Sequence, residues 1–207
     1  MPVRRGARTL VLVLSLMAVM ALTAGAPSAS AVSADKVTGG QSGLFIPLSN
    51  VSKLANAGIW VTPISPAFLT FTSQEGPAIR FPISGGVVES ATMLGTVNHA
   101  GGMLIQKVDL TDFSVQKELQ VTEVKIVNGM TLAGNVFGLV PAPTADLVNG
   151  SHSKDPSSGV IHFEADAQIN AVNATVLNTY FDTTAFEAGM TLGRVKANIE
   201  TKKILGL

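Results

Sequence analysis

The sequence predicts an all-β domain, an antiparallel sandwich or barrel of about eight to eleven strands with one amphipathic helix near the C-terminus. Three observations predict it. Apolar and polar residues alternate along most of the chain after residue 44, with the two-residue period of strands. The pair Asn128-Gly129 lies between two such runs, as in a tight hairpin. Residues 169–181 change to the three-and-four spacing of a helix.

The first 31 residues have the pattern of a secretory signal peptide. An apolar run over residues 10–22 is short for a membrane span, and Ala29-Ser30-Ala31 is a small-x-small cleavage site. The run follows a basic start made of Arg4, Arg5 and Arg8. We therefore expect a protein that is secreted, extracellular or associated with the cell wall, exported by the general or the twin-arginine route. Residues 32–43 are polar and glycine-rich, and they predict a flexible lead-in.

The charge balance excludes some classes of partner. Beyond residue 31 the chain has 176 residues with 11 basic and 14 acidic side chains, so it has no basic footprint for nucleic acid. Charged residues make up 14% of the chain, against about 25% in typical domains. A surface so poor in charge is compatible with self-association or cell-wall contact. No later apolar stretch is long enough for a transmembrane anchor.

The chain has no cysteine, which excludes disulfides, thiolate metal sites and a cysteine nucleophile. An exported, folded domain without disulfides suggests a bacterial envelope protein. Serine hydrolysis has no Gly-x-Ser-x-Gly elbow to support it, and no phosphate loop or dinucleotide motif occurs. Asp109, Asp112 and Glu118 could be paired as glycosidase carboxylates, but a single tryptophan and a single tyrosine offer no sugar platform. We expect no enzyme and no obligatory cofactor.

Glycine and proline residues indicate where the predicted helices and strands begin and end. Ser49 or Asn50 can begin a brief helix over residues 51–57, with Gly58 as its left-handed stop. Residues 141–159 contain several prolines and serines and predict a long loop within a single domain over residues 44–207. The expected strands cover residues 44–48, 59–64, 68–72, 79–83, 92–98, 103–110, 113–115, 119–127, 130–140, 160–168 and 190–199. The apolar face of the late helix consists of Ile169, Val172, Val176, Leu177, Tyr180 and Phe181.

Two histidines are candidate site residues, one together with two neighbouring carboxylates and one among glycines. His162, Glu164 and Asp166 alternate along one strand and share its face, so they form either a metal patch or the solvated side of a half-buried strand. Ligands spaced along one strand do not converge on one ion without other groups, which favours the solvated side. His99 lies among glycines, either as a turn histidine bonded to a backbone carbonyl or as a ligand-pocket histidine.

A resemblance concerns the centre of the chain. Residues 81–86 (FPISGG) and 95–104 (GTVNHAGGML), with the strand over 108–115, resemble the core of the HtaA-type domain of actinobacterial surface proteins. The resemblance implies a β-rich, secreted or wall-attached domain associated with haem binding. Haem-binding members use an early tyrosine in an aromatic-rich segment, whereas residues 59–72 here hold Trp60, Phe68 and Phe71 but no tyrosine. His99 carries over by motif, and Tyr180 is the second tentative ligand residue, on the late helix.

Three functional interpretations stay open. The first is a secreted, non-catalytic β-sandwich protein of a bacterial envelope, acting by binding or as part of the surface layer. The second is a carrier of haem or another apolar small ligand, with His99 facing the pocket. The third is a lipid-binding barrel, whose continuous apolar interior would alternate in sequence just as a packed core does.

Overall fold

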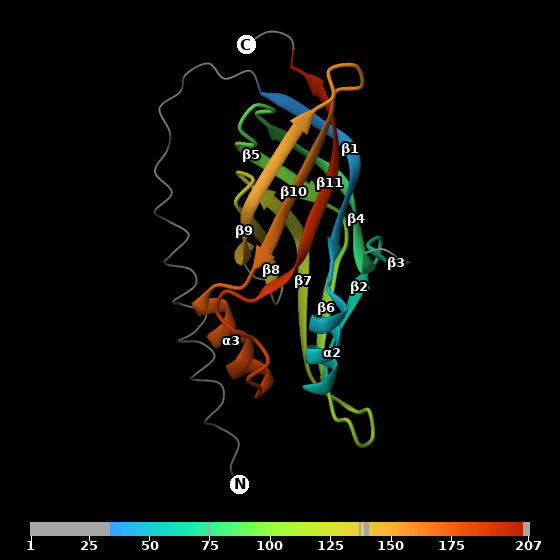
Figure 1. Ribbon diagram of the computed structural model, residues 1–207, viewed down its shortest axis with the longest axis vertical. Helices are drawn as coiled ribbons and strands as arrows, with labels where there is room; N and C mark the ends of the chain where they lie inside the picture. Colours follow the sequence, from blue (N-terminus) through green and yellow to red (C-terminus); the bar gives the residue numbers. More distant parts are fainter. Residues whose placement is uncertain (1–33, 74, 137, 139–140, 205–207) are drawn as a thin grey trace. The chain divides into compact units, whose positions relative to one another are not determined.

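The computed structural model describes residues 34–204 apart from 74, 137 and 139–140 (Figure 1). The predicted signal peptide therefore lies outside the described residues. Two helices are α2 (Leu48–Asn56) and α3 (Ala171–Phe181). The strands are β1 (Asp35–Phe45), β2 (Ile59–Ile64), β3 (Phe68–Thr72), β4 (Gly76–Val88), β5 (Gly95–His99), β6 (Gly102–Val108), β7 (Val115–Val127), β8 (Thr131–Val136), β9 (Pro141–Lys154), β10 (Val160–Gln168) and β11 (Thr191–Lys203).

Eight of the strands close into an antiparallel barrel. Around the ring they run β7-β5-β4-β1-β11-β10-β9-β8, and β8 pairs again with β7. β6 and β2 continue outward from the first half of β7, and β3 pairs with the first half of β4 (Figure 1). The all-β class and the helix near the C-terminus are confirmed, and of the two predicted architectures the chain adopts the barrel.

The predicted Asn-Gly hairpin joins β7 to β8. Asn128 and Gly129 have φ angles of 52° and 61°, and the N–H of Met130 donates to the carbonyl of Val127 at 3.1 Å. Asparagine and glycine tolerate this left-handed conformation better than other residues do. The turn thereby sets the register of β7 against β8, and this pairing closes the barrel.

The expectation of a flexible lead-in over residues 32–43 is wrong for residues 35–43, which belong to β1. β1 pairs with β11 on one side and with β4 on the other, so it is a central strand of the barrel. Its glycines suit close backbone approach: a Cβ on Gly40 would lie 2.0 Å from the carbonyl oxygen of Asn198. A glycine-rich composition therefore marks tight strand packing here.

The expected long loop over residues 141–159 is wrong as well. Residues 141–154 form β9, which pairs with β8 and β10, and only the turn at residues 155–159 remains. Ala145 and Leu147 of β9 are buried in the barrel, while its serines and His152 are outside or partly exposed. Serine, asparagine and proline make this segment look like a loop by composition. The buried residues of β9 occupy only alternate positions, so the polar residues of its outer face dominate the composition.

Both predicted helices form, with shifted ends. α2 begins after Pro47 and not after Ser49 or Asn50, and Gly58 (φ 71°) ends it as expected. Asn50 has a different partner, because its Nδ2 donates to the carbonyl of Thr191 at 2.5 Å. α3 is capped by Asn170, whose side chain accepts from the N–H of Asn173. Its buried side is narrower than the sequence predicts, and Val172 is exposed.

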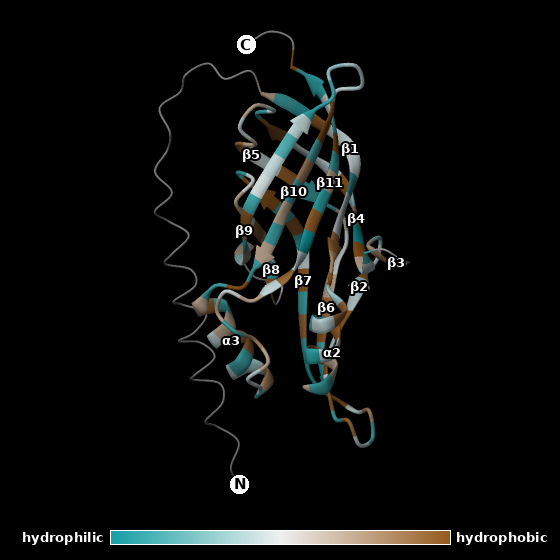
Figure 2. Cartoon of the chain, viewed as in Figure 1, coloured by the Kyte–Doolittle hydropathy of each residue, from teal (hydrophilic) through white to brown (hydrophobic). Residues whose placement is uncertain are grey.

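Two apolar clusters fill the domain. Side chains from alternate positions of the barrel strands make the larger cluster, including Val97, Ile126, Ile161 and Ile199, each at most 1% exposed. The second cluster joins α3, α2 and β2 around Phe181. Figure 2 shows the corresponding alternation of hydrophobic and hydrophilic residues along the barrel strands. In the described part of the chain, no helix has the length and apolar character needed to cross a membrane.

Candidate functional site

His99 lies at the end of β5 and faces the barrel interior. It is 5% exposed, and both ring nitrogens are engaged: Nδ1 donates to the carbonyl of Val124 at 3.1 Å, and Ser42 Oγ donates to Nε2 at 2.6 Å. The ring of Phe81 packs edge-on with its centroid 6.2 Å away. The bond to a backbone carbonyl, which belonged to one of the two sequence alternatives, is present, and Ser42 is a second partner of the ring.

Burial lowers the pKa of His99 to about 4, because the interior disfavours the imidazolium, although the bond to the Val124 carbonyl acts in the opposite direction. The imidazole is therefore neutral near pH 7. The space beside it, bounded by residues such as Phe81 and Met103, has a volume of about 10 Å³. Such a space holds at most about one water molecule. A serine bonded to a histidine resembles a nucleophile and its base, but here no substrate can reach the pair.

Tyr180 lies on α3, away from His99. Its hydroxyl donates to the carbonyl of Glu118 in β7 at 2.5 Å, and its ring packs edge-on against Phe181 with centroids 4.9 Å apart. The side chain thus joins the C-terminal half of α3 to β7. The structure does not bring the two tentative ligand residues together: His99 faces the barrel core and Tyr180 belongs to the second cluster.

His162, Glu164 and Asp166 share the outer face of β10, as predicted, while the alternate residues of this strand are buried. Each of the three bonds to a different group. His162 Nδ1 bonds to Asn198 Oδ1 at 2.8 Å, Glu164 accepts from Arg194 at 2.7 Å, and Asp166 accepts from Asn149 at 3.0 Å. No group of three or more potential metal ligands occurs among the described residues.

The outer face of β10 borders a hollow of about 370 Å³ that extends over β11 and β1 to β4. Strand register places its side chains in rows. One row runs Arg80, Gly43, Lys196, Glu164, and the next continues from Gln41 through Asn198 to His162. We call this space the Gly43 hollow, after the glycine of β1 that pairs with two of its lining residues, Arg80 and Lys196. Glycine at the centre of the first row lets the side chain of Arg80 lie directly over β1, because a Cβ on Gly43 would be 2.9 Å from Arg80 Nη1.

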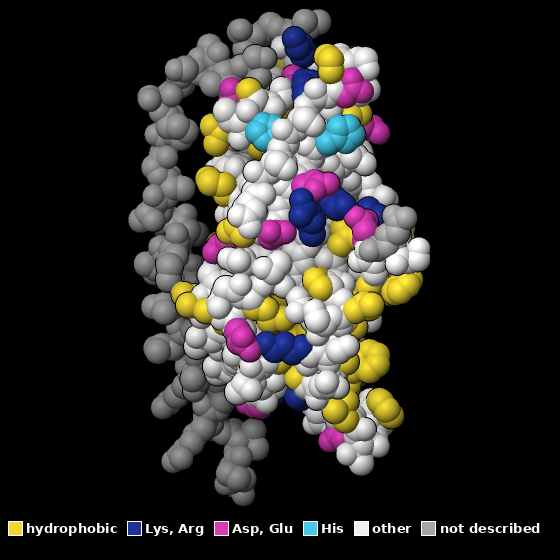
Figure 3. All heavy atoms as spheres, viewed as in Figure 1, with side chains coloured by type: hydrophobic (Ala, Val, Ile, Leu, Met, Phe, Trp, Pro, Cys, Tyr) yellow, Lys and Arg dark blue, Asp and Glu magenta, His cyan; other side chains and the backbone are white. Residues whose placement is uncertain are grey.

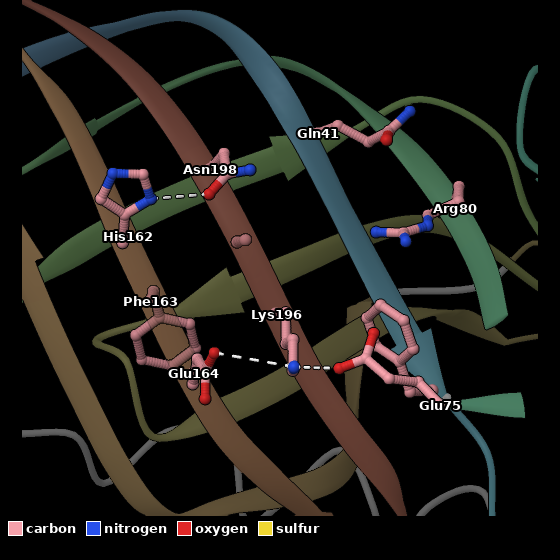
Figure 4. A pocket seen from close by; sticks show the side chains of 10 residues that line it. Gln41, Glu75, Arg80, His162, Phe163, Glu164, Lys196 and Asn198 are labelled. Carbon is pink, nitrogen blue, oxygen red and sulfur yellow. Dashed lines mark hydrogen bonds and ion pairs between the residues drawn. The ribbon is translucent and has the colours of Figure 1, made fainter. Parts of the chain in front are cut away.

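Charged side chains surround the Gly43 hollow. Lys196 bonds to Glu75 and lies 3.9 Å from Glu164. Arg80 and Lys196 both lie over the ring of Phe45, at 4.5 and 5.3 Å from its centroid. Figure 3 shows basic and acidic side chains gathered midway along this face, with histidine nearby. Figure 4 shows the guanidinium of Arg80 and the amide of Asn198 directed toward each other across β1.

Sequence reasoning found His162 and Glu164 but missed the rest of the hollow. Gly43 and Gln41 were placed in the lead-in, and Arg80 and Lys196 are single basic residues in unremarkable strands. Their common signal is position: all lie on outward-facing sites of neighbouring strands. That signal needs the strand order and register, which alternation along one strand does not give.

Apolar side chains are exposed at another place, on the two edge strands. β2 pairs only with β6 and β3 only with β4 within the described residues. Trp60 on β2 is 47% exposed, and Phe71 on β3 is 69% exposed, with Phe68 and Leu69 beside it. In Figure 3 hydrophobic side chains gather along the lower right margin of the face. Exposed clusters of this kind are typical of contact surfaces.

Comparison with solved structures finds a similar fold. The crystal structure of the C-terminal domain of HtaA from Corynebacterium glutamicum matches 81% of this chain and 99% of that domain, with a TM-score of 0.56 and 13% sequence identity. No protein-family model matches the sequence, and no curated protein matches it. The chain has an HtaA-like fold, as the resemblance of its central segments implied.

Proposed function

We propose that this chain is a non-enzymatic binding domain of an exported bacterial surface protein, and that it binds on its outer faces and not inside the barrel. The HtaA-like fold supports the assignment to a binding domain. The observation that carries the proposal is the filled barrel interior. Ser42 and His99 are 3% and 5% exposed and satisfy each other, and the space next to them is about 10 Å³. Neither a lipid chain nor a haem fits such a space.

Haem or another flat apolar ligand is the second candidate, and the exposed side chains of β2 and β3 favour it. Trp60, Phe68 and Phe71 offer aromatic surface that a flat ring system could cover. The candidate needs no ligand bond from His99, which the barrel encloses. Tyr180 also has its hydroxyl bonded to the backbone of β7. If the protein carries a flat apolar ligand, the ligand would therefore bind on the edge strands β2 and β3, and not at His99 and Tyr180 as predicted from the sequence.

Titration of the mature chain (from Val32) with haemin, followed by the Soret band, separates the two candidates. A saturable, shifted band with about one haem per chain, lost in the Phe71→Ala variant and retained in His99→Gln, would establish the edge-strand carrier. No spectral change would favour a surface partner, and sedimentation would then show whether that partner is a second copy.

The non-enzymatic part of the proposal has its own test. Hydrolase activity that disappears when Asp109, Asp112 or His99 is substituted would contradict it. The structure gives the two aspartates another role: Asp109 Oδ1 accepts from the N–H of Thr111, and Asp112 Oδ1 from the N–H of Ser114. These bonds stabilise the β6–β7 turn. We therefore expect the alanine variants to lower the free energy of unfolding and to leave any catalytic rate unchanged.

A further inference from the structure

The Gly43 hollow holds one cation that lacks a carboxylate partner. Its carboxylates are already paired, Glu75 with Lys196 and Glu164 with Arg194. Arg80 is different: among the described residues no carboxylate lies within ion-pair distance of its guanidinium. Nε donates to Thr70 Oγ1 at 3.3 Å, and neither terminal nitrogen has a hydrogen-bond partner in the described part of the chain.

The position of Arg80 directs these nitrogens into the hollow. Its side chain crosses the backbone of β1 at Gly43, where a Cβ would lie 2.9 Å from Nη1. The guanidinium also lies over the Phe45 ring, 4.5 Å from the centroid, which limits its freedom on the other side. A guanidinium held between a glycine backbone and an aromatic ring loses little entropy on binding an anion.

Amide groups add to the donors. Asn198 Oδ1 is engaged by His162, so Nδ2 of Asn198 is directed across β1 toward Arg80 (Figure 4). Gln41 lies in the row of Asn198 and His162, its side chain is directed away from Asn198 on the β4 side of β1, and it has no hydrogen-bond partner within the described residues (Figure 4). With the carboxylates of Glu75 and Glu164 paired to Lys196 and Arg194, the donors left to bind a ligand are the terminal nitrogens of Arg80 and the amides of Asn198 and Gln41. Such a set favours a carboxylate or phosphate, which accepts bidentate bonds from arginine.

We propose that the Gly43 hollow binds an acidic sugar unit, with its carboxylate or phosphate on Arg80 and its hydroxyls among Gln41, Asn198 and His162. A volume of about 370 Å³ lies within the range of small-ligand sites and exceeds what a bare oxyanion fills. Seven of the ten lining residues are polar or charged and three are apolar (Phe45, Phe163 and Ala197), which suits a hydroxylated ring better than a wholly apolar one. This inference rests on the proposed outer-face binding and gives it a ligand class.

The test uses ¹⁵N-labelled mature chain and four probes: glucuronate, glucose 6-phosphate, glucose and inorganic phosphate. We expect the two acidic sugars to give saturable amide shifts around Gly43 and Lys196, and glucose to give none. Arg80→Gln should weaken binding at least tenfold. Lys36→Gln, which removes the same charge from the outer face of β1 outside the hollow, should leave it unchanged.

Each other outcome overturns part of the proposal. Equal shifts with glucose, or unchanged affinity in Arg80→Gln, would refute the role of Arg80. Inorganic phosphate binding as tightly as glucose 6-phosphate would reduce the site to an oxyanion site and refute the sugar. If Arg80→Gln does not fold, Arg80→Lys keeps the charge without the planar fork, and its affinity should still fall. Absence of any shift refutes this inference alone, because haemin or surface binding is measured separately.

Discussion

Ser42 and Gly43 are neighbours in β1, yet they lie in two opposite environments. Ser42 points into the barrel, where its hydroxyl and both nitrogens of His99 are bonded and no space for a ligand remains. Gly43 faces outward under Arg80, and Arg80 lines an outer hollow where several donors have no partner among the described residues. Burial forces polar groups to pair, because an unpaired one costs about 1–3 kcal/mol. Unpaired donors persist outside, where water satisfies them until a ligand replaces it.

The largest test of this contrast compares two phenylalanines. Phe81→Ala opens a cavity beside His99 in the barrel, and we expect it to lower the free energy of unfolding by about 3–5 kcal/mol. Phe71→Ala removes the same atoms from an exposed site on β3, where the cost should stay below about 0.5 kcal/mol. Urea denaturation of both variants measures the difference. If the two variants lose similar amounts of unfolding free energy, the edge strand β3 contributes to the stability of the domain as much as the barrel interior does.

A second test uses pH. His99 has a pKa of about 4 in the folded chain and an ordinary value of 6.5 in the unfolded chain. Between these values the unfolded state binds the additional proton, so stability falls as the pH decreases. We expect a loss of about 2 kcal/mol between pH 7.5 and pH 5, and about 3 kcal/mol once the pH is below 4.

Urea denaturation at pH 7.5, 6 and 5 measures this loss, and His99→Gln is the control. That variant cannot take up a proton at position 99, so its stability should change much less over the same range, whatever its value at pH 7.5. Asp155, whose pKa is lowered from 3.8 to about 2 by its bonds from Ser157 and then Ser158, keeps its contribution to stability throughout this range and loses it only below pH 3.8. A wild-type slope that persists in His99→Gln would assign the acid sensitivity to other groups.

The smallest effect is expected outside. Arg194 donates twice to Glu164, at 3.1 and 2.7 Å, on a face open to solvent. Exposed ion pairs contribute about 0–1 kcal/mol, so Arg194→Gln should alter the unfolding free energy by no more than that, and by less at high salt. Thermal melts at two salt concentrations measure it. A cost of several kcal/mol would show that the rows of charge on β10 and β11 stabilise the barrel.

Local patterns were informative where the structure depends on neighbouring residues. Asn128-Gly129 predicted its hairpin because the turn's backbone angles depend on those two residues. The alternation over residues 160–168 predicted which side of β10 is buried. Glycine-rich β1 and serine-rich β9 were missed, because their pairing comes from strands distant in the sequence. Composition alone favours loops for such segments.

The sequence by itself determined the class of fold, its helical segment and which face of β10 meets solvent, because period and turn chemistry act over a few residues. Only the tertiary structure decided that the strands close into a barrel, that Ser42 meets His99 across 57 positions, and that Arg80 and Lys196 flank Gly43. Strand order and register bring those residues together, and both are set by packing over the whole sheet. The residues that carry the proposed binding therefore become visible only after the chain has closed on itself.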